Sequence, residues 1–297
     1  MNWIILALIA VILWSVGSII TKFCRVRYFE NSTGYILFTL PTALLSLVLL
    51  FFEPFILLDF KTSLVAILTG ILGTITYYFF LEAVHKEEVS KVIVLLQTAP
   101  LFVLIESTFF LNEILALKEY IAFLMILIGA VLISLKKVEK RFVVTLGVIL
   151  AILCAFFYSI QSVLLKYLSE INLSTMMIYR EIGFVVSTLF IFLVSSNARA
   201  SLKKVIKDVN PKKTFLVYLA ESIGMAGFFI MYLALQQGPV SMVTVLDGLE
   251  TVFIIIWTVL LSIFFPKILK EEINKKTIVI KAMSIILMIA GLYLISI

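Results

Sequence analysis

The sequence predicts an all-α integral membrane protein in which ten transmembrane helices form two inverted five-helix repeats. Composition gives the membrane class: hydrophobic residues make up 63% of the 297 positions, charged residues only 14%, and mean hydropathy is +1.18. Soluble domains contain roughly 45–50% apolar and about 25% charged residues. Apolar runs long enough to cross a hydrocarbon core, about 20 residues each, follow one another along the chain, and the two halves share an internal repeat.

The repeat is visible as two short patterns. An aromatic, Ser, Ser, Lys pattern occupies Trp14, Ser15, Ser18 and Lys22 and, 144 positions later, Tyr158, Ser159, Ser162 and Lys166. An Ala, Val, Ser, Val pattern occupies Ala83, Val89, Ser90 and Val92 and, 151 positions later, Ala234, Val240, Ser241 and Val243. We therefore divide the chain into repeats at 1–141 and 142–297. An odd number of spans per repeat places the second repeat upside down in the membrane, as in many secondary transporters.

Each expected span is an apolar run bounded by short connections in which charged residues collect. The first run lacks a basic leader and a cleavage site, so we expect an uncleaved span rather than a signal peptide. The longest connection, Asn197 to Pro211, is basic and is expected to form a brief surface helix. Pro100 predicts a kink in the fourth span. The ten spans are expected at 3–22, 33–52, 63–84, 89–111, 119–135, 143–167, 174–196, 212–236, 240–265 and 276–296.

The distribution of positive charge predicts the orientation. Connections after odd-numbered spans contain about 19 Lys and Arg residues, whereas the other connections and the termini contain about 3. Positive loops remain in the cytoplasm, so both termini are expected outside the cytoplasm in a multi-pass protein of the cell membrane. The net charge of +6 is explained in the same way, and no nucleic-acid partner is expected.

Several classes of chemistry lack the residues they need. Cys24 and Cys154 have no ligand-like spacing and are interpreted as packing residues. The single histidine, His85, lies in a charged turn, which disfavours histidine-based metal sites and Ser-His catalysis. No phosphate-binding GxxxxGK[ST] loop is present. We expect no enzyme activity, no cofactor and no metal, while an intramembrane enzyme using paired carboxylates and a non-transporting scaffold subunit remain alternatives.

The ninth span contains the densest set of polar residues at membrane depth. Hydroxyl and carboxyl groups recur at helical spacing on one face, at Thr244, Asp247, Thr251, Thr258 and Ser262, with Glu250 beside Thr251. Ionisable groups at membrane depth usually face a cavity or each other. Glu221 in the eighth span is expected within roughly 6 Å of the depth of Glu250, at about 1.5 Å per residue, so the two carboxyls are expected to face one another.

Two interpretations of these carboxyls are equally weighted. In one, Glu221, Asp247 and Glu250 exchange a proton for substrate, because desolvation and repulsion perturb paired carboxyls. In the other, Glu221 or Glu250 forms a static pair with Arg180, which neighbours Glu181. A third alternative is direct binding of a cationic substrate group.

Other polar and aromatic positions admit both a binding and a packing role. Gln97 and Gln161 are candidates for a substrate contact or a helix–helix bond, whereas Tyr77 and Trp14 favour packing over a pocket wall. The repeated serines favour close helix packing, and Lys22 and Lys166 are expected to reach toward the interface. Glu106 is expected near a helix end, where it reaches the interface, and Glu113 is expected to cap the following helix or bond a loop.

Taken together, the repeated first helix, the Ala83…Val89-Ser90 turn and Leu111-Asn112-Glu113 before an apolar helix that ends near Gly129 resemble the EamA-like family of the drug/metabolite transporter superfamily. The resemblance implies a ten-helix carrier of small metabolites, amino acids or drugs. Asn112 departs from it, because the family often has Gly there, and the second half carries about 11 extra residues near 265–276. The family is commonly drawn with cytoplasmic termini, which conflicts with the charge distribution. We therefore expect a secondary active transporter of a small organic metabolite, with the bilayer and a small-molecule substrate as partners and a proton as the candidate coupling ion.

Overall fold

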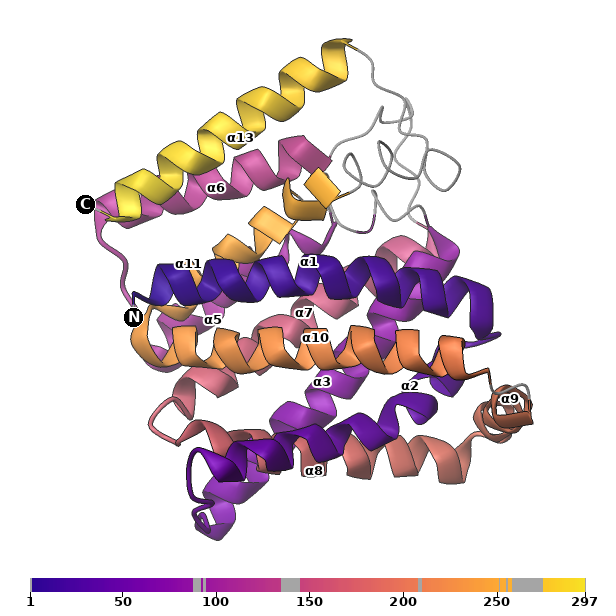
Figure 1. Cartoon of the computed structure of the whole chain (residues 1–297). Helices are drawn as coiled ribbons and strands as arrows, with labels where there is room; N and C mark the ends of the chain where they lie inside the picture. Colours follow the sequence, from indigo (N-terminus) through magenta and orange to yellow (C-terminus); the bar gives the residue numbers. More distant parts are fainter. Residues whose placement is uncertain are drawn as a thin grey trace.

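The described residues of the computed structural model form a bundle of helices. They are residues 2–87, 92, 95–134, 145–207, 210–250, 252–254, 256–257 and 275–296, and among them no strand occurs (Figure 1). Six segments are long and apolar enough to cross a membrane: Trp3–Arg25, Ser32–Phe51, Phe60–Lys86, Leu146–Tyr167, Leu173–Val194 and Pro211–Gln237. The all-helical fold class is therefore confirmed.

The first repeat contains α1 (Trp3–Tyr28), α2 (Ser32–Thr39), the 3-10 helix η1 (Leu40–Phe51), α3 (Phe60–Lys86), α5 (Ala99–Leu111) and α6 (Leu117–Ser134). Side chains immediately before three of these helices accept a bond from a first-turn backbone N–H, which satisfies a donor that has no partner inside the helix. These capping residues are Asn2, Asn31 and Asp59. They fix where α1, α2 and α3 begin.

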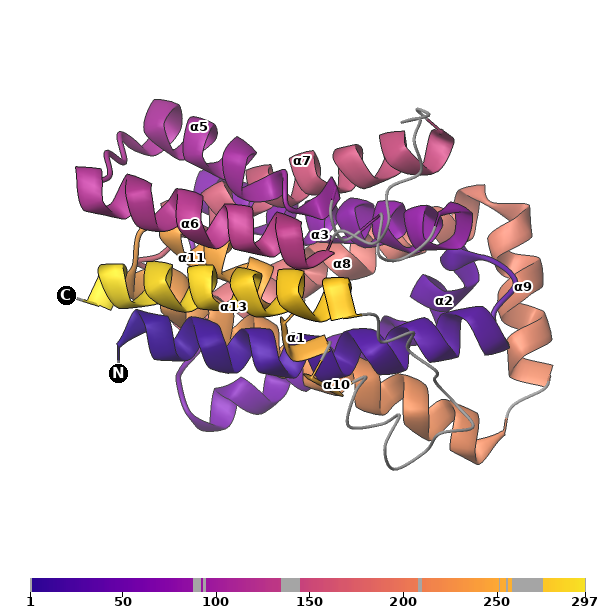
Figure 2. The same cartoon turned by 90° about the horizontal axis from the view of Figure 1, so that it is seen from above.

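The second repeat contains α7 (Leu146–Tyr167), α8 (Leu173–Val194), α9 (Ser196–Lys207), α10 (Pro211–Gln237), α11 (Val240–Val245), the 3-10 helix η2 (Leu246–Leu249) and α13 (Lys275–Ser296). Thr145, Asn172 and Asn210 cap α7, α8 and α10 in the same manner. Helix α9 is the short surface helix expected between the seventh and eighth spans, and it crosses the end of the bundle (Figures 1 and 2).

Two expected spans are interrupted, the fourth close to the kink predicted at Pro100 and the ninth where a continuous helix was expected. In the fourth, the chain turns at Gln97 and Thr98, and α5 starts at Ala99 with Pro100 in its first turn, where the missing N–H costs nothing. In the ninth, α11 has six residues and gives way to η2. The prediction of one regular helix face along 240–265 is therefore wrong for residues 246–249, which form the 3-10 helix η2. Thr251, Thr258 and Ser262 lie outside the described residues.

The main helix contacts join one repeat to the other. Helix α1 packs along α10, α3 along α7, α6 against α13, and α5 against α11 (Figures 1 and 2). In each repeat the first long helix thus pairs with the third of the opposite repeat, while the fourth and fifth pair with their own equivalents. The packing has the twofold character that the sequence repeat predicts.

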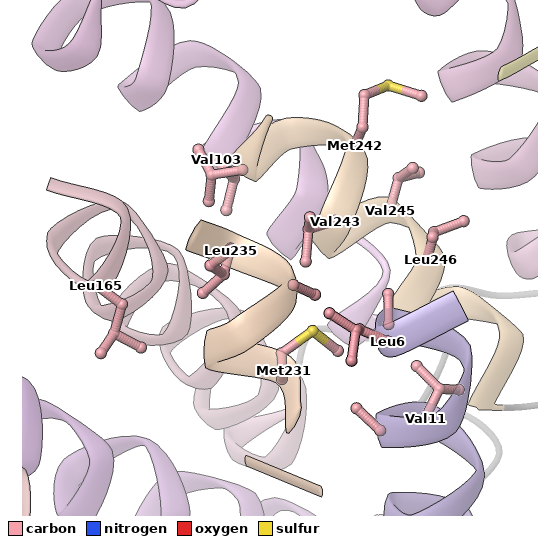
Figure 3. Close-up of a cluster of buried hydrophobic side chains, with 14 of the residues drawn as sticks. Leu6, Val11, Val103, Leu165, Met231, Leu235, Met242, Val243, Val245 and Leu246 are labelled. Carbon is pink, nitrogen blue, oxygen red and sulfur yellow. The ribbon is translucent and has the colours of Figure 1, made fainter. Parts of the chain in front are cut away.

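Equivalent helices run in opposite directions. The start of α1 and the end of α7 meet at the same end of α10: the Trp3 ring lies against Gly238, and Lys166 binds the carbonyl of Gly238. A buried apolar cluster fills this end of the bundle, with side chains from α1, α5, α7, α10, α11 and η2 (Figure 3). Helices of both repeats therefore share one core.

Helices α3 and α8 approach each other through glycine. A Cβ atom on Gly70 would clash with the carbonyl oxygen of Arg180, and one on Gly183 would clash with that of Ile67. Small residues allow backbones in membrane helices to approach closely, so that van der Waals contacts hold them together.

Candidate functional site

The two interrupted helices lie against each other. The offset of 151 that relates Val89 to Val240 also relates Gln97 to Gly248, so both breaks occur at the same position of the repeat. A Cβ on Gly248 would lie 3.0 Å from Oε1 of Gln97, which places this side chain of the first repeat at the break in the second. Interrupted segments at corresponding positions of two halves are typical of substrate sites in transporters.

Asp247 lies in η2, at the break itself. Tyr158 on α7 donates a 2.6 Å hydrogen bond to its Oδ2 atom. The Oδ1 atom is buried and has no hydrogen-bond partner among the described residues. Buried polar atoms are normally paired. This oxygen is therefore a hydrogen-bond acceptor whose capacity is unused.

Glu250 follows one turn later and contacts the first repeat. Ser18 on α1 donates a 2.7 Å bond to its Oε1 atom. The repeated serine thus binds a carboxyl here, whereas its equivalent Ser162 donates to the backbone carbonyl of Tyr158.

Glu221 on α10 forms a second cluster. Tyr35 on α2 and Tyr77 on α3 donate bonds of 2.7 and 2.8 Å to the same Oε1 atom, and their rings meet edge-on at 6.2 Å. The contact thus joins three helices. Tyr35 was not among the expected site residues, because a single tyrosine in an apolar span has no polar periodicity that would distinguish it.

Arg180 does not pair with these carboxyls. Its ion pair is with Glu181, and its guanidinium lies 3.8 Å from the ring centroid of Phe228. Within the described chain, Glu221 and Glu250 accept bonds from hydroxyl groups, and no hydrogen bond joins one to the other. The alternative of a static pair between Arg180 and either of them is not what the structure contains.

Two further candidates hold helices together. Gln161 donates a 2.9 Å bond from α7 to the Thr69 carbonyl on α3, and Trp14 donates a 3.0 Å bond from α1 to the Gly224 carbonyl on α10. Trp14 and Tyr158 both border a small void of about 10 Å³, which has room for about one water molecule. This void is therefore too small for a metabolite in this conformation.

Glu106 and Glu113 are placed differently from expectation. Ser159 donates a 2.8 Å bond to Oε1 of Glu106, whose other oxygen is buried without a partner among the described residues, so this carboxyl lies between helices rather than at the interface. Glu113 accepts from the backbone N–H groups of Val240 and Ser241 at 2.8 and 3.0 Å. It caps α11 of the opposite repeat, not the helix that follows it.

The turn between α10 and α11 is held from both sides. Lys166 donates to the carbonyls of Leu235 and Gly238 at 2.8 and 2.9 Å, at the end of α10. A cation at the end of α10 and the Glu113 carboxylate at the start of α11 both complement helix dipoles. Asn112 positions Glu113 with a left-handed backbone, φ 52° and ψ 32°, which explains why glycine would also suit this position.

Comparisons with known proteins agree with this architecture. One solved structure, titled "Crystal structure of protein", is 17% identical over 98% of this chain and 94% of its own, with a TM-score of 0.68, and shows a similar fold. No curated protein matches the sequence. The sequence model of the EamA-like transporter family matches residues 1–135 and 145–297, one match to each repeat. The chain therefore belongs to the EamA-like transporter family.

Proposed function

We propose that this protein is a secondary active transporter that moves a small organic metabolite across the cell membrane by alternating access. The observation that carries the proposal is the meeting of two interrupted helices at Asp247, in a chain that matches a transporter family over both repeats. Carboxyl groups within membrane spans usually mark substrate or ion pathways.

The proposed architecture is ten spans in two inverted repeats. The six long apolar segments supply six of them. The remaining four are the segments that contain α5, α6, α11 with η2, and α13. The opposite directions of α1 and α7 support the inversion, because equivalent helices of inverted repeats cross the membrane in opposite senses.

Alternating access requires contacts that can separate at either side of the site. Ser18 and Ser15 on α1 contact Glu250 and Trp257, and Ser159 on α7 contacts Glu106 on α5. These hydrogen bonds join the two repeats at two equivalent interfaces, which we call seams: one between α1 and the segment containing Glu250 and Trp257, the other between α7 and α5. We propose that each seam opens in one of the two access states, as rocking of one repeat against the other requires.

A proton is the proposed coupling ion. Glu221, Asp247 and Glu250 are bonded to neutral hydroxyl groups, and none forms an ion pair within the described residues. An isolated negative charge inside a membrane protein is costly, and either a proton or a cationic substrate would neutralise it. Exchange of one for the other would couple their movements.

The proposed orientation places both termini outside the cytoplasm, because the basic α9 connection is then cytoplasmic. Asn197 is exposed on α9, whereas the native Cys24 and Cys154 are buried. An Asn197→Cys variant in intact cells should resist an impermeant thiol reagent and react after permeabilisation. Labelling of intact cells would reverse the orientation.

The test of function is transport into proteoliposomes under an imposed pH gradient. Solutes that raise the thermal stability of the purified protein are the first to assay, because a ligand of the folded state stabilises it. We expect saturable uptake that responds to the gradient and is lost in Glu221→Gln. The matched control is Glu30→Gln, which alters an exposed acid paired with Lys204. Uptake that ignores the gradient and survives Glu221→Gln contradicts proton coupling, and absence of uptake for every stabilising solute contradicts the carrier.

A further inference from the structure

The side chains that line the void between Trp14 and Tyr158 restrict the kind of ligand that can bind there. We propose that Asp247 is the counter-ion for a protonated amine on the transported solute, and that the apolar part of the solute occupies the enlarged void. The inference rests on the proposed transport function and names the chemical class of its substrate.

Donor groups around the void are already engaged. The hydroxyls of Ser162, Thr244 and Tyr232 donate to backbone carbonyls at 2.9, 2.8 and 2.7 Å. The Trp14 N–H and the Tyr158 hydroxyl are also bonded, to Gly224 and to Asp247. A solute that needs donors, such as a carboxylate or phosphate, would therefore have to break existing bonds.

An acceptor, in contrast, is open. Oδ1 of Asp247 is buried and has no partner among the described residues, and Tyr158 connects this carboxyl to the wall of the void. A buried acceptor left unpaired costs about 1–3 kcal/mol. A ligand N–H donor would remove this cost, so the site favours a donor group over an acceptor.

Charge selects a cationic donor. Glu250 adds a second carboxyl three positions after Asp247, and neither carboxyl belongs to an ion pair in the described part of the chain. Arg180 is paired with Glu181 and stacked on Phe228, and no ion pair joins it to Asp247 or Glu250 in the described residues. A protonated amine would supply the missing positive charge, whereas an alcohol would supply a donor without the charge.

The remaining walls favour an amine with an apolar body. Aromatic rings of Trp14 and Tyr158 border the void, and aromatic faces attract ammonium groups. The aliphatic walls come from Leu165, Met231, Leu235 and Val243. Because the void now has a volume of only about 10 Å³, binding requires α7 and α10 to separate, after which the amine can donate to the unpaired Oδ1 while Tyr158 keeps its bond to Oδ2.

Three probes that share a phenylethyl body separate these requirements: 2-phenylethylamine, 2-phenylethanol and phenylalanine. Binding to the purified full-length protein is measured by calorimetry and by thermal shift. We expect the amine to bind, the alcohol to bind at least tenfold more weakly, and the additional carboxylate of phenylalanine to weaken binding. Asp247→Asn should weaken amine binding at least tenfold, while Glu30→Gln should not change it. A monodisperse gel-filtration profile and helical circular dichroism establish that the variant is folded.

The proposal is overturned if the alcohol binds as tightly as the amine, or if folded Asp247→Asn retains amine binding. Counterflow of labelled 2-phenylethylamine in proteoliposomes tests the underlying transport function separately. Asp247-dependent binding without counterflow would uphold the amine site and contradict the carrier. Saturable uptake of another solute that is unchanged in Asp247→Asn would uphold the carrier and contradict the amine site.

Discussion

Ser159 on α7 donates a 2.8 Å hydrogen bond to Glu106 on α5, and the opposite half of the molecule repeats this contact with its polarity reversed. The offsets of the sequence repeat relate Ser159 to Ser15 and Glu106 to Trp257. There, the Trp257 indole N–H donates a 2.9 Å bond to Ser15. The serine is a donor in one seam and an acceptor in the other, so the two seams have the same geometry but different strengths.

This difference predicts a ranking of three serine variants. Ser159→Ala leaves both oxygens of Glu106 without a partner and should cost about 1–3 kcal/mol, since bonds to a carboxylate are the stronger kind. Ser15→Ala removes a neutral bond and should cost about 0.5–1.5 kcal/mol. Ser201→Ala is the control, because the buried Ser201 hydroxyl has no hydrogen-bond partner in the described structure. Thermal unfolding in detergent measures the order, and equal melting temperatures for all three would contradict it.

Glu113 belongs to the first repeat but caps α11 of the second, so its loss should destabilise the second repeat. Glu113→Ala removes the acceptor for two N–H groups at the start of α11, and loss of such a cap costs about 0.5–2 kcal/mol. Glu30→Ala removes only an exposed ion pair, which is worth about 0–1 kcal/mol. Glu113→Ala should therefore melt at a clearly lower temperature than Glu30→Ala, and protease should cleave near the α10–α11 turn more readily. Equal melting and cleavage would show that the cap does not stabilise this turn.

Substitution by alanine should have opposite outcomes at Gly183 and Gly224. Gly183→Ala places a methyl group against the Ile67 carbonyl, and backbone cannot move aside as a flexible side chain can. The expected cost is about 1–3 kcal/mol or more. A Cβ on Gly224 meets no atom within 4 Å, so Gly224→Ala should be tolerated. Yield of monodisperse protein and melting temperature compare the two, and a stable Gly183→Ala protein would mean that α3 and α8 are not so tightly packed.

Asp59 lies outside the membrane spans, and its hydrogen bonds predict that the stability of the protein depends on pH. Hydrogen bonds from Thr62 lower the pKa of Asp59 below its ordinary value of 3.8. A carboxyl whose pKa is lower in the folded state contributes stability above its unfolded pKa, and this contribution disappears as pH falls through the folded pKa. The melting temperature of the native protein should exceed that of Asp59→Ala at neutral pH, and the difference should shrink below about pH 4. A difference independent of pH would contradict the cap.

Much of the helical organisation could be predicted from the sequence. Apolar length and the positions of Asn31, Asp59 and Asn172 suffice to locate helix starts, because these are local properties. Pro100 also indicated the interruption in the fourth span, but the one in the ninth could not be located from the sequence. Leu246 to Leu249 has helix-compatible residues, and its 3-10 geometry arises where Gly248 meets Gln97 and Ala130 of the other repeat.

The sequence indicated the acids of the candidate site and one partner, Tyr77, but not the other partners. Glu221, Asp247 and Glu250 stand out because charge is rare in apolar spans. Tyr35, Tyr158 and Ser18 bind them through contacts between residues 89 to 232 positions apart. Depth along a span indicates which groups share a level, but not which faces meet. For this reason Glu221 and Glu250 were expected to face each other, whereas each has its own hydroxyl partners.

The pairing of α1 with α10, α3 with α7 and α6 with α13 has a consequence for biogenesis. While the ribosome synthesises the chain, the helices of the first repeat emerge before the helices of the second repeat that they pack against have been made. The nascent amino-terminal half must therefore persist as loosely associated helices in lipid. Final assembly awaits α13, whose Met288 meets Gly129 of α6.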